Sequence, residues 1–218
     1  MSTLEPLVGR RIGLIDGVEK VSGRADYTAD LDHGPAFVGR IYRSPHAHAD
    51  IISVDVSRAR AVPGVIAIIT GDECDIPFGI IPIAQNEFPL ARDRVRYRGE
   101  PVAAIAAIDE ASAEMALRLI DMKVRPLPAY FGADKARQDD ATALHDDRPG
   151  NLEREVHSEF GDVDEGFKAA DLVSEDSYDC AEVTHVHMEP HASLAAWDAE
   201  RGRITLHSVT QVPFYVHL

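Results

Sequence analysis

The stretch "GRIYRSPHAHADIISVDVSRARAVPGVIAIITGDE", residues 39–73, decides the fold class of this chain. Two runs rich in β-branched and apolar residues, 36–44 and 49–57, are separated by a turn-like Pro-His-Ala-His, and each predicts a strand. Residues 56–64 fit a short helix that a proline and a glycine end, and the apolar run 65–70 predicts a buried strand. Short strands that alternate with helices are typical of a mixed α/β or α+β unit.

The same pattern continues to about residue 131. The segment "VRYRGEPVAAIAAID", residues 95–109, predicts two strands around a turn at Gly99. Asp109 is placed to cap a helix over residues 110–120, and the residues of its apolar face recur at the 3, 4 and 7 spacing. They are Ala113, Ala116, Leu117 and Ile120. Residues 122–131 return as a strand that two prolines end, so residues of about 36 to 125 are expected to form one mixed α/β or α+β unit.

The second part of the chain reads differently. Residues 132–150 are polar, contain proline and glycine, and show little apolar periodicity, which is typical of a linker. Residues 153–189 predict a strand, a short helix that Asp162 and Glu165 cap, and a second strand. The runs "ASLAAWD" and "RITLHSVTQ" predict a hairpin across "AERG", and a proline then starts a helix. A second domain is therefore expected over residues 151–218.

Composition narrows the function classes. The chain has 218 residues, is 45% hydrophobic and can bury a core. Its net charge of −15 comes from acidic residues spread along the chain, without the basic stripe of nucleic-acid or membrane-surface binders. Its apolar runs fall far short of the roughly 20 residues of a membrane span. The first residues lack an apolar signal core, so the sequence predicts a cytoplasmic protein.

One group of side chains is a candidate metal site. In a strand, His185, His187, Glu189 and His191 would face one side, and imidazole with carboxylate can bind zinc or iron. Pro190 interrupts such a strand, and the sequence favours a buried polar strand whose imidazoles and carboxylate satisfy neighbouring backbone groups. The same interpretation applies to the pair His46 and His48, at a turn that leads into a strand.

Other local signatures of catalysis are missing from the sequence. Cys74 and Cys180 lie outside any CxxC pattern and are expected to be buried thiols. The glycines match neither a phosphate-binding loop nor a dinucleotide fingerprint, and the serines form no GxSxG elbow. Local chemistry alone therefore leaves the function open.

Several segments together resemble the large, molybdenum-binding subunit of the xanthine oxidase family of molybdenum hydroxylases, in the order and spacing of that family. These segments are "VEKVSGRADYTADL", residues 39–73, "VRYRGEPVAAIAAIDEASAEMAL", "HDDRPGN", "HMEPHASLAAWD" and "VTQVPFYVH". The resemblance covers nearly the whole chain. It implies an α+β fold with an N-terminal arm, residues 1–19, and an α/β-hammerhead domain, residues 20–131. After the linker, residues 132–150, it implies the truncated start of a molybdopterin-binding α+β domain over residues 151–218. Because such subunits run several hundred residues further, the chain is expected to be an N-terminal fragment, inactive by itself.

Within that family, residues 77–101 and 153–163 are most similar to the alpha subunit of 4-hydroxybenzoyl-CoA reductase. This similarity implies reductive removal of a phenolic hydroxyl from an aromatic CoA thioester. It also implies a molybdopterin cofactor, as its cytosine dinucleotide, and electron transfer through a small iron-sulfur subunit and an FAD subunit. Two alternatives stay open: a hydroxylase of the xanthine, aldehyde or CO dehydrogenase type, and a non-catalytic hammerhead module that makes protein contacts.

The resemblance assigns a role to one residue of the cofactor site. Gln211 in "VTQVP" matches the glutamine that hydrogen-bonds an oxo ligand of molybdenum in the family. Its alternative role is that of a strand-end amide that caps the following helix. The family's metal is held by the dithiolene of the pterin, so "HMEPH" is implied to be a structural strand and no metal ligand is expected in this chain. The catalytic base and the substrate-binding residues are expected beyond Leu218.

Overall fold

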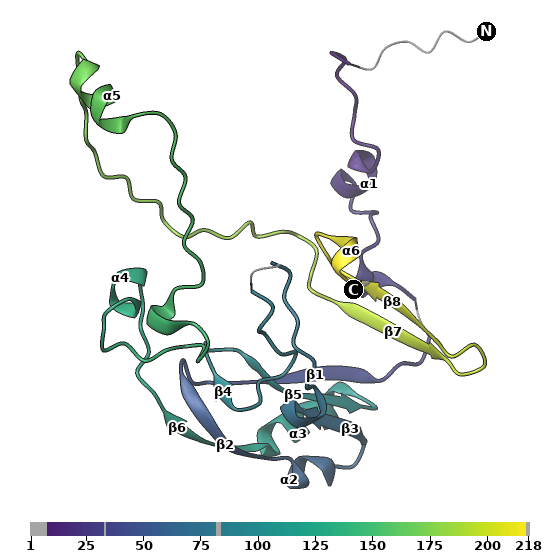
Figure 1. The fold of residues 1–218 in the computed structure, drawn as a ribbon. Helices are drawn as coiled ribbons and strands as arrows, with labels where there is room; N and C mark the ends of the chain where they lie inside the picture. The colour runs from purple at the N-terminus through teal and green to yellow at the C-terminus, as the bar shows by residue number, and fades with distance from the viewer. Residues whose placement is uncertain (1–7, 33, 82–83, 217–218) are drawn as a thin grey trace, which may run out of the picture. The chain divides into compact units, whose positions relative to one another are not determined.

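The computed structural model describes residues 8–32, 34–81 and 84–216 (Figure 1). The chain forms two compact units, one of residues 35–174 and one that combines residues 1–34 with residues 175–218. The start of the expected N-terminal arm and Leu218 lie outside the described residues. The expected domain boundaries stay predictions.

Two three-stranded antiparallel sheets form the framework of the first unit. The strands of the first sheet lie in the order β1 (Val38–Arg43), β5 (Pro101–Ala107), β3 (Val65–Thr70). Those of the second lie in the order β4 (Arg94–Val95), β2 (Ala49–Asp55), β6 (Asp121–Pro126). The strands predicted from the sequence are confirmed here, although β4 is only two residues long because the turn before β5 begins directly after it.

Strand β5 contributes to two apolar cores because its side chains alternate between the two faces of the sheet. Ala103 and Ile105 pack with the helices α2 (Ser57–Arg60) and α3 (Glu110–Leu119). Val102 points the other way, into a core with residues of the second sheet. The predicted helix and its cap are confirmed: Ser112 N donates to the Asp109 carboxylate at 2.7 Å. Its predicted face is buried, with Ala113 and Ala116 fully enclosed, Ile120 in the core and Leu117 packed against it.

The first unit continues beyond the sheets. It carries the helices α4 (Ala133–Ala136) and α5 (Val163–Ala169) and the 3-10 turns η2 (Gly71–Glu73) and η3 (Pro149–Asn151). Asp162 caps α5 as predicted, by accepting from Glu165 N at 3.0 Å. The two strands predicted on either side of α5 are wrong: residues 152–162 and 170–192 form no strand. Within the part of the chain that the structure describes, no neighbouring strand pairs with them, and a strand is stable only when paired.

The second unit holds the predicted hairpin, which is confirmed. Strands β7 (Ser193–Asp198) and β8 (Arg203–Ser208) pair over their full length, and the Asp198 carboxylate accepts from two backbone amides of the turn. Helix α1 (Gly17–Val21), the turn η1 (Thr28–Asp30) and helix α6 (Pro213–Val216) complete this unit. Among the described residues, no helix combines the length and the apolar character that crossing a membrane requires.

Candidate functional site

Gln211 lies at the bend between β8 and α6 and is exposed. The bend follows from its neighbours, because Val212 N donates to Thr210 Oγ1 at 3.2 Å and Pro213 then opens the helix. The side-chain amide is thus presented at the end of a strand, on a backbone that a local hydrogen bond fixes. Its predicted role at molybdenum stays a prediction.

The histidine group around Glu189 does not form a metal site in this structure. The rings of His187 and His191 meet edge to face, with centroids 4.8 Å apart, and Glu189 Oε1 accepts from Thr28 N at 3.4 Å. Residues 185–191 form no strand and are exposed except for the half-buried Glu189, so the predicted buried polar strand is wrong, and a strand does not align these side chains on one face. In the described ranges, no three or more His, Cys, Asp or Glu side chains group to hold a metal ion.

The second histidine pair is a structural feature. His48 is buried, and its Nδ1 lies 2.6 Å from Pro128 O at the end of β6. Its Nε2 is buried without a hydrogen-bond partner among the described residues, so the prediction of a fully satisfied side chain holds for one ring nitrogen only. Ser44 closes the turn around His46 by accepting from its backbone N at 3.0 Å.

Both cysteines are free thiols. Cys74 is half-buried, whereas Cys180 is exposed, so the prediction of buried thiols is wrong for Cys180. The physical reason is that Cys180 belongs to the extended segment around residues 170–192, which builds no core.

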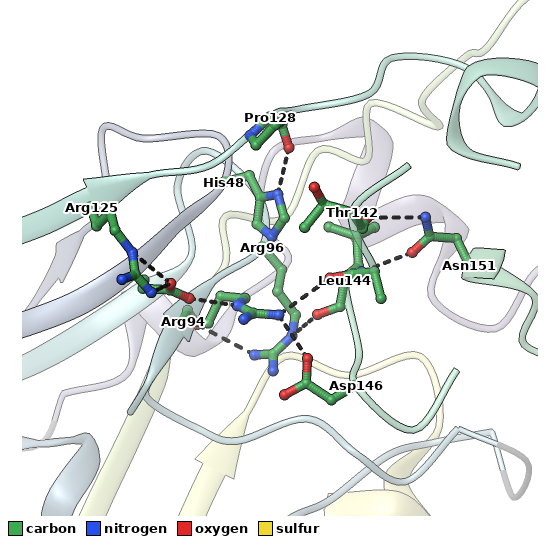
Figure 2. A network of polar contacts seen from close by, with 11 residues as sticks. His48, Arg94, Arg96, Arg125, Pro128, Thr142, Leu144, Asp146 and Asn151 are labelled. Atoms are coloured by element: carbon green, nitrogen blue, oxygen red, sulfur yellow. Dashed lines mark hydrogen bonds and ion pairs between the residues drawn. The ribbon is translucent and has the colours of Figure 1, made fainter. Parts of the chain in front are cut away.

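A row of charges that sequence reasoning missed crosses the second sheet (Figure 2). Asp50 on β2 lies opposite Arg94 on β4 and opposite Arg125 on β6. Arg94 Nε donates to Asp50 Oδ1 at 2.8 Å, and Arg125 Nη2 donates to Asp50 Oδ2 at 2.5 Å. These hydrogen bonds, first from Arg125 and then from Arg94, lower the pKa of Asp50 below its ordinary value of 3.8.

Arg94 also reaches out of the sheet, to a segment that we call the anchored loop, residues 142–151. Arg94 Nη1 donates to Ala143 O at 3.2 Å and to Asp146 Oδ1 at 3.0 Å. Next to it, Arg96 Nε donates to Leu144 O at 2.9 Å (Figure 2). Two arginines thus hold the loop mainly through its backbone carbonyls, which any sequence offers. The sequence carries no signal for this contact.

Asn151 braces the anchored loop from inside. Its Oδ1 accepts from Leu144 N at 2.8 Å, and its Nδ2 donates to Ala136 O at 2.8 Å and to Thr142 O at 3.2 Å. Asn151 has a φ of 54°, a left-handed conformation in which asparagine is enriched. The segment expected to be a linker is therefore partly a fixed structure on the first unit.

A cavity of about 450 Å³ lies between the anchored loop and the turn before β5. Glu100 lines it and accepts from Arg96 N, and burial raises the pKa of its carboxyl group. His145 of the loop lines it as well, and burial followed by the nearby charge of Arg96 lowers the pKa of its ring. Both shifts favour the uncharged form of the side chain, because desolvation penalises the charged one.

Comparison with known proteins identifies both parts of the chain. The family model "Aldehyde oxidase and xanthine dehydrogenase, a/b hammerhead domain" matches residues 22–128. The model "Molybdopterin cofactor-binding domain" matches residues 144–218. The expected fold, a hammerhead domain followed by the start of a molybdopterin-binding domain, is confirmed.

Curated relatives match nearly the whole chain. The nicotinate dehydrogenase large molybdopterin subunit of Eubacterium barkeri is 36% identical over 213 residues, which is 96% of this chain and 48% of the relative. The xanthine dehydrogenase molybdenum-binding subunit of Escherichia coli O157:H7 is 34% identical over 212 residues, which is 93% of this chain and 28% of the relative. The chain thus spans less than half of the length of these relatives.

Solved structures agree on the fold. Quinoline 2-oxidoreductase from Pseudomonas putida 86 superposes with a TM-score of 0.80 at 28% identity, covering 93% of this chain and 27% of that chain. CO dehydrogenase from Oligotropha carboxidovorans gives a TM-score of 0.80 at 27% identity, covering 95% of this chain and 28% of the other. By sequence and by fold, the chain belongs to the xanthine oxidase family of molybdenum-binding large subunits.

Proposed function

We propose that this chain supplies the hammerhead domain and the first part of the cofactor-binding domain of a molybdopterin-dependent oxidoreductase. The observation that carries the proposal is the succession of the two family matches, residues 22–128 and 144–218, along one chain. Because the chain spans less than half of the length of the two curated relatives described above, we expect turnover from the complete subunit and none from this chain by itself.

Gln211 is the residue of this chain that we place at the cofactor. Its exposed amide is a neutral hydrogen-bond donor, and such a donor suits an oxo ligand because it adds no charge to the site. Molybdopterin, in our proposal as its cytosine dinucleotide, supplies redox-active molybdenum when it is bound. The part of this chain is to hold a hydrogen-bond donor at the end of β8 and to orient it through the bend before α6.

For the substrate, we favour hydroxylation of a nitrogen-containing heteroaromatic ring. The support comes from two relatives, one named for nicotinate at 36% identity and one named for xanthine at 34% identity. Reductive dehydroxylation of 4-hydroxybenzoyl-CoA is the second candidate, and it rests on the similarity of residues 77–101 and 153–163 to the corresponding reductase.

We further propose partner subunits that carry iron-sulfur clusters and FAD. A molybdenum centre that oxidises or reduces an organic substrate must exchange electrons with another redox group. The described part of this chain has two free cysteines and none of the cysteine sets that iron-sulfur clusters require. Such clusters would therefore be bound outside the described residues, and we propose that a separate small subunit carries them.

The test is a substrate panel with the complete enzyme, purified with its partner subunits and with the molybdenum content measured. Nicotinate and xanthine are assayed with an artificial electron acceptor, and 4-hydroxybenzoyl-CoA is assayed with a reduced electron donor. Turnover of a heteroaromatic substrate supports our proposal, and turnover of the CoA thioester alone selects the second candidate. An enzyme free of molybdenum after expression in a molybdopterin-producing host would favour the non-catalytic module instead.

A further inference from the structure

We propose that Arg94 and Arg96 are positioning residues that fix the entry of the molybdopterin-binding domain onto the hammerhead sheet. We also propose that cofactor retention in the complete subunit depends on this anchor, a part of the inference that rests on the proposed function.

The first observation is where the structural unit ends. The family matches divide the chain between residues 128 and 144, whereas the compact first unit continues to residue 174. The opening residues of the molybdopterin-binding match therefore pack with the hammerhead sheets. The boundary between the two family models thus lies inside one compact unit.

The second observation is the chemistry of that contact. The guanidinium group of Arg94 bridges the sheet and the loop, with Nε on Asp50 and Nη1 on both Ala143 O and Asp146. A planar guanidinium group has donors in fixed, diverging directions and can serve both sides at once, which the compact ammonium group of lysine cannot. Arg96 adds a second attachment at Leu144 O.

The third observation is that Arg94 is shielded on its sheet side and that the loop is braced, although Asp146 on the loop side is 88% exposed. The side chains of Arg94 and Asp50 are 19% and 18% exposed, so water and salt screen this pair less than a surface pair. Asn151 ties the two ends of the anchored loop to each other. Arg94 and Arg96 attach the loop to the second sheet at Ala143, Leu144 and Asp146. Other hydrogen bonds that leave the loop go to the segment directly before it, from Thr142 N to Tyr130 Oη and from Asn151 Nδ2 to Ala136 O.

The same row of charges offers a matched control. Arg125 also pairs with Asp50, but its side chain is 72% exposed. Among the described residues, its hydrogen bonds and ion pair go to Asp50 and none goes to the anchored loop. Removing Arg125 disturbs Asp50 without touching the loop. Removing the guanidinium group of Arg94 disturbs both Asp50 and the anchored loop.

The first experiment is amide hydrogen exchange on the 218-residue chain with Arg94→Lys, Arg94→Ala and Arg125→Ala. We expect exchange in residues 142–151 to be about tenfold faster in both Arg94 variants and unchanged in Arg125→Ala, with β5 protected throughout. Arg94→Lys keeps a positive charge beside Asp50, so it decides the result if Arg94→Ala unfolds the unit. Equal exchange of the loop in Arg94→Lys and Arg125→Ala would overturn the anchor.

The second experiment measures the molybdenum that the complete subunit retains during prolonged dialysis, together with turnover per bound molybdenum. We expect Arg94→Lys to lose molybdenum several-fold faster than Arg125→Ala, while turnover per remaining metal stays at the wild-type value. Equal loss in the two variants overturns the cofactor part and leaves the exchange result standing. A wild-type subunit that never contains molybdenum refutes the proposed function, and the anchor is then judged by exchange alone.

Discussion

Gln211 and Arg94 show how differently single residues can be inferred. The resemblance of "VTQVP" to a family motif singles out Gln211 from the sequence, and the structure adds its exposed position at the end of β8. The partners of Arg94 could not be inferred, because Asp50 and Ala143 lie 44 and 49 residues away and a backbone carbonyl has no sequence signature. A sequence motif can identify a side chain with a specific chemical role, such as Gln211. A side chain that binds backbone carbonyls, such as Arg94, is identified only once the fold is known.

At the residue scale, we predict that Gln211→Ala lowers turnover per bound molybdenum in the complete enzyme by at least about tenfold, because a hydrogen bond to a metal ligand is lost. Stability should change by only about 1 kcal/mol, the value of one side-chain hydrogen bond. The measurements are turnover at quantified metal content and urea denaturation. Gln138→Ala, the same change at an exposed site in the first unit, is the control. Equal turnover of the two variants would return Gln211 to a purely structural role.

At the scale of elements, the sequence is most informative where periodicity and pairing agree. The helix α3 is predicted with its cap and its buried face, because Asp109 and the alanine spacing act locally. The strands beside α5 are predicted wrongly from residues of high β-propensity such as Val156 and Val183. Propensity describes one strand, whereas stability comes from the neighbour that pairs with it.

The charge row of the second sheet should make stability depend on pH. The folded pKa of Asp50 lies below 3.8, so this residue stabilises the fold above that value and loses its contribution as the pH falls through the folded pKa. We predict that the free energy of unfolding of the wild type falls more steeply than that of Asp50→Asn between about pH 5 and about pH 2. Urea denaturation at each pH measures this difference. Parallel profiles would show that the row does not stabilise the sheet through charge.

At the scale of the whole molecule, two family domains and two compact units divide the chain at different places. The two family models meet between residues 128 and 144. The compact unit that contains the sheets ends later, at residue 174. The polar composition of residues 132–150 suggests a linker, but the anchored loop is held by side chains of the sheet and by Asn151. The composition of a segment indicates how much apolar surface it can bury. It does not indicate which hydrogen bonds side chains of other segments donate to its backbone.

We therefore predict where a protease cuts first. The side chains of residues 152–188 are all exposed, and α5 is the one helix described within them. A broad-specificity protease in limiting amounts should cleave within 152–162 or 170–188 before it cleaves the anchored loop, because cleavage requires local unfolding of the bound segment. Mass spectrometry of the first fragments identifies the sites. First cuts within residues 142–151 would contradict the anchor.

The hairpin of the second unit carries the single tryptophan of the chain, Trp197. It lies opposite Ile204 across the two strands, and both side chains are more than 60% exposed. An indole in water emits at longer wavelength than one in an apolar environment. Excitation at the long-wavelength edge of the indole band, where the six tyrosines hardly absorb, confines the emission of this chain to Trp197. Any polypeptide or ligand that covers this face of the hairpin would shift the emission toward the blue, without a label and without a signal from the hammerhead sheets.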